Sequence, residues 1–128
     1  MSIWLPTLDQ VILIHERLIL LTGGADGIRD LGLVDSALAR ATASFSGVEA
    51  HPSLISKAAA ICCGLTKNHG FIDGNKRIGI TTMLMIMRRN AVPLSYTQDE
   101  LIHLCLSIAQ GKIDVPEVEA WLQAHISE

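Results

Sequence analysis

The chain has 128 residues and a mass of 13.8 kDa, enough for one self-supporting core but not for two ordinary domains, so we expect a single domain over residues 1–128. Its composition is 49% hydrophobic with a mean hydropathy of +0.37, and we expect a partner to cover part of this apolar surplus. A net charge of −3 excludes a broad nucleic-acid footprint, which would need clustered Lys and Arg, so we expect no direct nucleic-acid partner.

The cysteines and the hydropathy profile favour the reducing cytosol. All three cysteines lie inside apolar helical patterns, where a free thiol behaves as a small hydrophobe: Cys62, Cys63 and Cys105. No apolar run reaches the ~20 residues needed to cross a bilayer, and residues 1–7 lack the pattern of a signal peptide. We therefore expect a cytoplasmic protein without a membrane partner.

Helical periodicity dominates the first third of the chain. The first helix is predicted to begin after Thr7, which has capping-box spacing, and to end at Gly23. A shorter helical pattern over residues 33–41 follows a stretch rich in Gly and Asp. Residues 42–50 then turn irregular around Phe45, which is either a core anchor or part of a flap that grips a protein substrate.

The next two helices are predicted to be the buried pair of the fold. The first runs from Pro52, in its first turn, to about His69, and the second from about Asn75 to Asn90. Apolar residues cover nearly every direction around both axes, which is typical of buried helices.

Two more helices complete the chain. Thr97–Glu100 and Asp114–Glu117 show capping-box spacing, and Gly111 ends the first of these helices. Neither an internal repeat nor a linker interrupts the pattern. We therefore expect an all-α fold, a compact bundle of about six helices.

The segment between the two predicted buried helices is richer in glycine and polar groups than packing requires. It reads His69-Gly70-Phe71-Ile72-Asp73-Gly74-Asn75-Lys76-Arg77. Lys76 and Arg77 fall in the first turn of a helix, where the helix dipole disfavours cations by about 0.3–1 kcal/mol each. A bound phosphate would remove this conflict, because it accepts hydrogen bonds from the backbone N–H groups and pairs with both cations. Gly74 would let the backbone approach that phosphate closely.

Three other residues of the segment suggest a metal ligand, a general base and a loop anchor. Asp73 would repel the phosphate unless a divalent cation bridged them, so we expect Mg²⁺ held by this carboxylate and by nucleotide oxygens. His69 ends the preceding helix, and the ordinary histidine pKa of ~6.5 suits a general base that takes a proton from an attacking hydroxyl. Phe71 is expected to turn inward and anchor the loop.

This segment resembles the Fic motif, His-x-Phe-x-Asp/Glu-Gly-Asn-Gly/Lys-Arg, and it meets every defined position. With Lys76 in the eighth place, the chain is similar to the Doc (death-on-curing) branch of that family. The similarity continues through residues 14–16, 27–30 and 36–40, so it covers most of the chain.

The resemblance implies a Fic fold with His69 as the base, Asp73 as the metal ligand, and Asn75, Lys76 and Arg77 on the phosphates of ATP. It also implies a toxin that acts as a protein kinase, because the Doc branch is understood to present the γ-phosphate to a Ser or Thr hydroxyl. The implied target is elongation factor Tu, whose phosphorylation arrests translation. A Phd-like antitoxin would neutralise the toxin by folding into a groove on it.

Two alternatives remain open. AMP transfer on the same scaffold is typical of relatives with glycine in place of Lys76 and with a second arginine where this chain has Ile80. The Doc branch has asparagine at the next position, where this chain has Thr81, so that contact differs as well. A non-catalytic module that only binds a nucleotide or an antitoxin is disfavoured by intact His69 and Asp73, because binding alone needs no base.

The remaining histidines have simpler interpretations. For His15, in the amphipathic first helix, a structural role is favoured over a site role. No other potential metal ligands lie at a recognisable spacing from His51, His103 and His125, so a zinc site is disfavoured.

Overall fold

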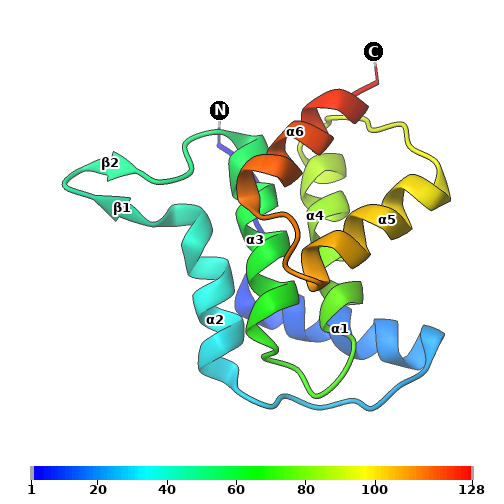
Figure 1. Ribbon diagram of the computed structural model, residues 1–128. Coiled ribbons are helices and arrows are strands. Elements are labelled where there is room, and N and C mark those ends of the chain that lie inside the picture. Colours follow the sequence, from blue (N-terminus) through cyan, green and yellow to red (C-terminus); the bar gives the residue numbers. More distant parts are fainter. Residues whose placement is uncertain (1, 128) are drawn as a thin grey trace.

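The computed structural model describes residues 2–127, and within them six α-helices make up most of the chain (Figure 1). In chain order they are α1 (Leu8–Thr22), α2 (Leu31–Ala39), α3 (Leu54–Asn68), α4 (Asn75–Arg89), α5 (Gln98–Ala109) and α6 (Val115–His125). A short 3-10 helix, η1 (Arg40–Thr42), extends α2, and a hairpin of two antiparallel strands, β1 (Ser44–Phe45) and β2 (Val48–Glu49), follows it. The predicted all-α class and helix number are confirmed.

Helix α3 forms the centre of the bundle. Every residue from Ser56 to Thr66 is buried, and α2, α4, α5 and α6 all pack against this helix (Figure 1). A glycine allows the close approach of α4, because a Cβ at Gly79 would lie 2.9 Å from the carbonyl oxygen of Cys62. The prediction that this helix is buried on all sides is confirmed.

Helix α4 is buried over part of its circumference only. Its buried residues are Asn75, Ile78, Gly79, Thr82, Met83, Ile86 and Met87. The predicted burial on all sides is wrong for this helix, because Ile80, Leu84 and Met85 are only half-buried. Leu84 and Met85 line a groove between α4 and residues 91–96. The apolar sequence pattern of α4 therefore serves both the core and a surface groove.

Side-chain caps fix most helix starts where the sequence predicts them. Thr7, Thr97 and Asp114 each form a capping box, so these three predictions are confirmed. The start of α3 differs by about a residue. A capping box at Ser53 begins the helix there, and Pro52 lies before it rather than in its first turn.

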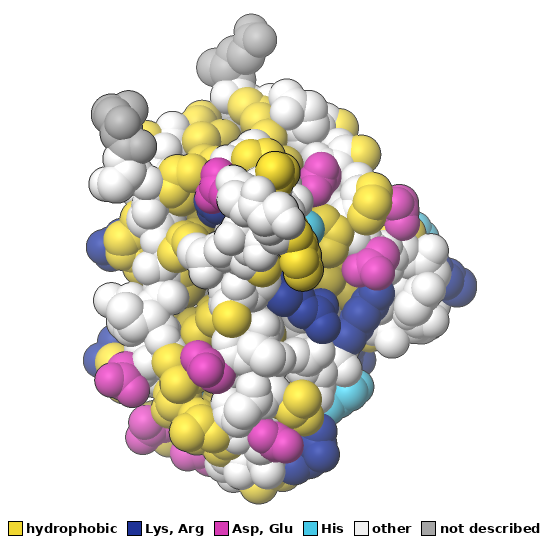
Figure 2. Space-filling view, turned by 90° about the vertical axis from the view of Figure 1, so that its left-hand side faces the viewer, with side chains coloured by type: hydrophobic (Ala, Val, Ile, Leu, Met, Phe, Trp, Pro, Cys, Tyr) yellow, Lys and Arg dark blue, Asp and Glu magenta, His cyan; other side chains and the backbone are white. Residues whose placement is uncertain are grey.

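Residues 42–50, expected to be irregular, contain the hairpin. Strands of two residues are too short to show alternation in the sequence. Phe45 and Val48 are 75% and 69% exposed, so Phe45 is not a core anchor. The hairpin projects from the helices, with hydrophobic side chains on its surface and Lys and Arg side chains beside it (Figures 1 and 2).

Lys57 of α3 ties both ends of the hairpin to the bundle. The residue is only 6% exposed, and its ammonium donates hydrogen bonds to the backbone carbonyls of Ala41 (2.8 Å) and His51 (2.7 Å). A third bond reaches a carboxylate oxygen of Glu49 at 3.1 Å. All three N–H donors of the ammonium are thereby used, which compensates for the burial of its charge.

Two of the cysteines are buried in α3. Burial raises the pKa of Cys62, and it raises the pKa of Cys63 to about 12. Such thiols are unreactive and act as core residues, as the sequence predicts. Among residues 2–127, none of the helices combines the length and the apolar character that a membrane span needs.

Candidate functional site

The predicted catalytic segment is the connection between the end of α3 and the start of α4. His69 caps the C-terminus of α3 in the left-handed backbone region, with φ of 51° and ψ of 47°, and its side chain is exposed. Gly74 begins α4, also with a left-handed backbone (φ 78°). Since α3 ends and α4 begins here, the bundle holds this short loop at two fixed points.

The strap, residues 27–30 between α1 and α2, pairs with the loop from the outside. The carbonyl oxygen of Gly70 accepts hydrogen bonds from the backbone N–H groups of Arg29 (2.8 Å) and Asp30 (2.9 Å). The N–H of Ile72 donates to the carbonyl of Gly27 at 3.1 Å. These bonds give the loop the backbone pairing of a short antiparallel ladder, and so restrict its motion.

Phe71 anchors the loop from the inside. Its ring is 2% exposed and stacks on the buried imidazole of His15, with the ring centroids 3.8 Å apart and the planes inclined by 11°. The side-chain amide of Asn75 closes the loop, because its Oδ1 accepts from the N–H of Phe71 (3.1 Å) and its Nδ2 donates to the carbonyl of Phe71 (3.0 Å). Asn75 can therefore meet an anion chiefly through its backbone N–H.

Asp73 is a half-exposed carboxylate that is held in place by backbone donors. Its Oδ2 accepts from the N–H of Ala25 (3.2 Å) and its Oδ1 from the N–H of Gly74 (2.8 Å). These two hydrogen bonds, together with the nearby charge of Arg77, lower the pKa of Asp73 below its ordinary value. His15 fixes the backbone at the same residue, because its Nε2 lies 2.6 Å from the carbonyl oxygen of Asp73. The carboxylate is thus ionised and oriented.

The N-terminus of α4 lacks a side-chain cap, since Gly74 occupies the N-cap position. The other five helices begin with a capping side chain, from Thr7, Asp30, Ser53, Thr97 and Asp114. The first backbone N–H groups of α4 therefore remain available to an anion at the positive end of the helix dipole.

The two cations of this turn have different surroundings. Lys76 is exposed. The guanidinium of Arg77 donates to the hydroxyl of Thr22 and to the carbonyl of Gly23 (2.7 Å), and it lies 3.6 Å from Asp73. Nη1 makes both bonds to α1 and its C-cap and Nη2 faces Asp73, so Nε and the second N–H of Nη2 remain for an anion.

A cavity of about 530 Å³ brings these residues together. It is lined by Thr66, His69, Ile72, Asp73, Gly74, Asn75, Lys76, Arg77 and Ala109. Every predicted site residue except Phe71 therefore faces one space, and Phe71 lies beneath it. The arrangement combines an uncapped helix start, an oriented carboxylate and an exposed imidazole around one cavity.

Two site residues escaped the sequence reasoning. His15, interpreted as structural, contacts the loop directly through Phe71 and Asp73. Arg29 donates from Nε to the carbonyl oxygen of His69 at 2.6 Å. The only signal for either was their place inside the stretches at residues 14–16 and 27–30 that support the family resemblance.

Comparison with known proteins identifies the family of the chain. The Fic/DOC family matches residues 5–87, and the chain belongs to this family. Toxin Doc from Mycolicibacterium smegmatis (strain ATCC 700084 / mc(2)155) is 36% identical over 102 residues, which cover 78% of each chain. Protein kinase doc from Escherichia phage P1 is 29% identical over 110 residues, covering 86% of each chain. The resemblance read from the motif is thereby confirmed.

Proposed function

We propose that this chain is the toxin of a toxin–antitoxin pair, and that it transfers the γ-phosphoryl group of ATP to a Ser or Thr hydroxyl of a protein. One observation carries the proposal: the uncapped start of α4 opens into the same cavity as the exposed imidazole of His69. The names of the two relatives, a toxin and a protein kinase, support the same activity.

The phosphates of ATP would lie against the first turn of α4. The backbone N–H groups of Asn75, Lys76 and Arg77 would donate to phosphate oxygens, and the two cations would balance their charge. Gly74 adopts a left-handed backbone conformation, and because glycine has no side chain, nothing stands between the helix end and this anion. The otherwise unfavourable position of both cations is thereby explained.

Asp73 suits Mg²⁺ brought by the nucleotide. Within residues 2–127 there is no group of three or more His, Cys, Asp or Glu side chains that could hold a metal on its own. Mg²⁺ typically takes one or two protein carboxylates and completes its shell with phosphates and water, so a single oriented carboxylate fits this use. The metal, when bound, would neutralise charge on the phosphates.

His69 would act as the general base. Its imidazole nitrogen accepts the proton of the substrate hydroxyl while the hydroxyl oxygen forms a bond to the γ-phosphorus. The bond from that phosphorus to the bridging oxygen breaks, and ADP leaves with the bonding electrons. Histidine suits this role because it changes charge near neutral pH.

The α4 sequence favours phosphoryl transfer over AMP transfer. The second arginine of AMP-transferring relatives would stand at Ile80, an apolar side chain that is half-buried on α4. No cation is thus supplied from that position. The protein target proposed from the family resemblance is elongation factor Tu.

The hairpin suits a folded protein substrate better than a short peptide. Its apolar residues, Phe45 and Val48, are highly exposed. The hairpin follows α2 and precedes α3, whereas His69 lies beyond the far end of α3, about 22 Å away along a helix of 15 residues. A substrate that contacts both must span that distance.

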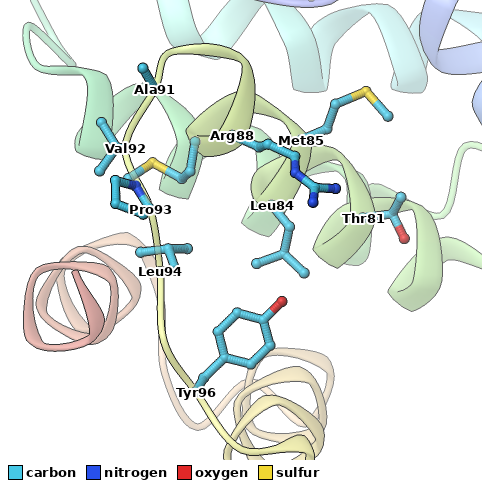
Figure 3. A pocket seen from close by; sticks show the side chains of 10 residues that line it. Thr81, Leu84, Met85, Arg88, Ala91, Val92, Pro93, Leu94 and Tyr96 are labelled. Carbon is cyan, nitrogen blue, oxygen red and sulfur yellow. The ribbon is translucent and has the colours of Figure 1, made fainter. Parts of the chain in front are cut away.

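The groove beside α4 is our candidate for the docking site of a Phd-like antitoxin (Figure 3). Its volume is about 770 Å³, and it is lined by Thr81, Leu84, Met85, Met87, Arg88, Ala91, Val92, Pro93, Leu94 and Tyr96. Leu84→Glu should weaken binding of the cognate antitoxin without reducing phosphoryl transfer. Leu31→Glu, at an exposed position at the start of α2, should leave binding intact. Equal affinities of both variants, measured by titration calorimetry, would exclude this groove.

ATP labelled separately at the α and γ phosphates tests the reaction itself. With purified elongation factor Tu as the substrate, we expect transfer of the γ label only. His69→Ala should lower the rate by on the order of 10²–10⁴, whereas His103→Ala, an exposed control on α5, should not. Transfer of the α label would establish AMP transfer. Growth arrest that persists in His69→Ala would favour a non-catalytic binding module.

A further inference from the structure

The side chain of Arg29 spans the C-terminal end of α3. Its Nε donates to the carbonyl oxygen of His69 at 2.6 Å, and its Nη2 lies 3.3 Å from the carbonyl oxygen of Asn68. Arg29 comes from the strap, so the contact joins segments 40 residues apart in the sequence. One guanidinium thus serves two carbonyls that the helix itself leaves unpaired.

The backbone of His69 needs such support. A left-handed backbone conformation is unfavourable for a non-glycine residue, and helices that end this way commonly use glycine. Here the residue at that position carries an imidazole, so surrounding contacts must hold the conformation. A cation at the negative end of the α3 dipole is well placed to do so.

We propose that Arg29 is a positioning residue, which holds the backbone of His69 in the left-handed conformation and so aims the imidazole into the cavity at the start of α4. The catalytic consequence rests on the proposed function, in which His69 is the base. The structural consequence, a fixed backbone at His69, does not depend on it.

Lysine could not replace this arginine fully. The planar guanidinium presents donors in a fixed fork that reaches two carbonyls at once, whereas an ammonium is a single point of charge on a flexible stem. The backbone N–H of Arg29 also donates to Gly70, and this bond survives any change of the side chain. Side-chain variants therefore test the guanidinium alone.

The test compares Arg29→Gln and Arg29→Lys with Arg17→Gln, which removes an exposed guanidinium from α1. Because a displacement of about 1 Å at a reacting group can lower a rate by about 10²-fold, we expect kcat of Arg29→Gln to fall on the order of 10- to 10²-fold. The KM for ATP should stay within about a factor of two, since phosphate binding is unaffected. Arg29→Lys should be intermediate, and Arg17→Gln should match wild type.

The backbone at His69 provides a readout that is independent of activity. The three-bond coupling between Hα of residue 69 and the carbonyl carbon of residue 68, measured by NMR, is large only for a positive φ, so it should be large in wild type and reduced by averaging in Arg29→Gln. An unchanged coupling and kcat in Arg29→Gln, or complete recovery by Arg29→Lys, would overturn the proposal. If His69→Ala retained full activity, the base assignment would fail, but the coupling would still decide the role of Arg29.

Discussion

Replacing His15 with phenylalanine should destabilise the protein even though an aromatic ring is kept. The side chain of His15 is 1% exposed, and its Nε2 lies 2.6 Å from the carbonyl oxygen of Asp73. Because that oxygen is an acceptor, the nitrogen must carry a proton. A phenylalanine ring would still stack on Phe71 but has no N–H, so the Asp73 carbonyl would lose this donor.

The magnitude follows from the loss of that hydrogen bond. Leaving a buried polar group unpaired costs about 1–3 kcal/mol. For 128 residues, an unfolding entropy of about 2.1 cal/mol/K per residue converts each kcal/mol into about 4 °C of melting temperature. We therefore expect His15→Phe to melt about 4–11 °C below wild type. His15→Gln, which keeps an N–H donor but loses the stacked ring, should separate the two contributions.

Circular dichroism melts of His15→Phe and His103→Phe provide the assay, because the second variant makes the same replacement at an exposed position of α5. The control should stay within about 0.5 kcal/mol of wild type, or about 2 °C. If both variants melted together, the bond from His15 to Asp73 would contribute nothing, and the interpretation of His15 as a support of the loop would be refuted.

Three further predictions concern the scaffold. Lys57→Met should lower the free energy of unfolding in urea by about 1–3 kcal/mol, because the buried carbonyl of Ala41 and the partly buried carbonyl of His51 would lose their donor, and should speed proteolysis of the hairpin. Gly79→Ala should destabilise although alanine favours helices, because its Cβ would lie 2.9 Å from the carbonyl oxygen of Cys62, and overpacking costs about 1–3 kcal/mol. The pair of His125 and Glu100, 2.7 Å apart, should make stability depend on pH. The hydrogen bond between them is the largest cause of a raised pKa of His125 and, together with hydrogen bonds from Thr97, lowers the pKa of Glu100 to about 2.

The sign of the pH effect follows from these shifts. The stabilisation from His125 is complete below its ordinary pKa of 6.5 and is lost as pH rises through its raised pKa. The contribution of Glu100 is complete above its ordinary pKa of 4.5 and is lost as pH falls towards about 2. The destabilisation caused by His125→Gln should therefore be largest between those two ordinary values.

Matched controls make each of these predictions decisive. Lys112→Met on the surface should be close to neutral, and Gly32→Ala at the exposed start of α2 should be neutral or stabilising by up to about 1 kcal/mol, because alanine favours helices. Urea midpoints of Lys57→Met or Gly79→Ala equal to these controls would contradict the packing argument. A stability difference for His125→Gln that is the same at about pH 5.5 and about pH 9 would contradict the ion pair.

Local signals made much of this fold predictable. Capping is decided within four residues, so the helix starts after Thr7, Thr97 and Asp114 follow from the sequence directly. The hairpin around Phe45 was missed because strands of two residues carry no period. The partial exposure of α4 was missed because an apolar pattern does not distinguish a core from a groove.

The site was predictable where its chemistry conflicted with local rules. Lys76 and Arg77 lie in the first turn of a helix, where the dipole disfavours cations, and this conflict is the sequence signal for the proposed anion site. The supports of the loop could not be found in this way. His15 reaches Asp73 across 58 residues, and such long-range contacts leave no trace in local periodicity.

The most direct test of the whole account is mass spectrometry of cellular proteins after the chain is induced, with His69→Ala in parallel. We expect one added phosphate on a Ser or Thr of a translation factor with the wild-type chain, and none with the variant. Added AMP would contradict the proposed reaction. Growth arrest without any modified protein, unchanged in His69→Ala, would contradict catalysis by this site.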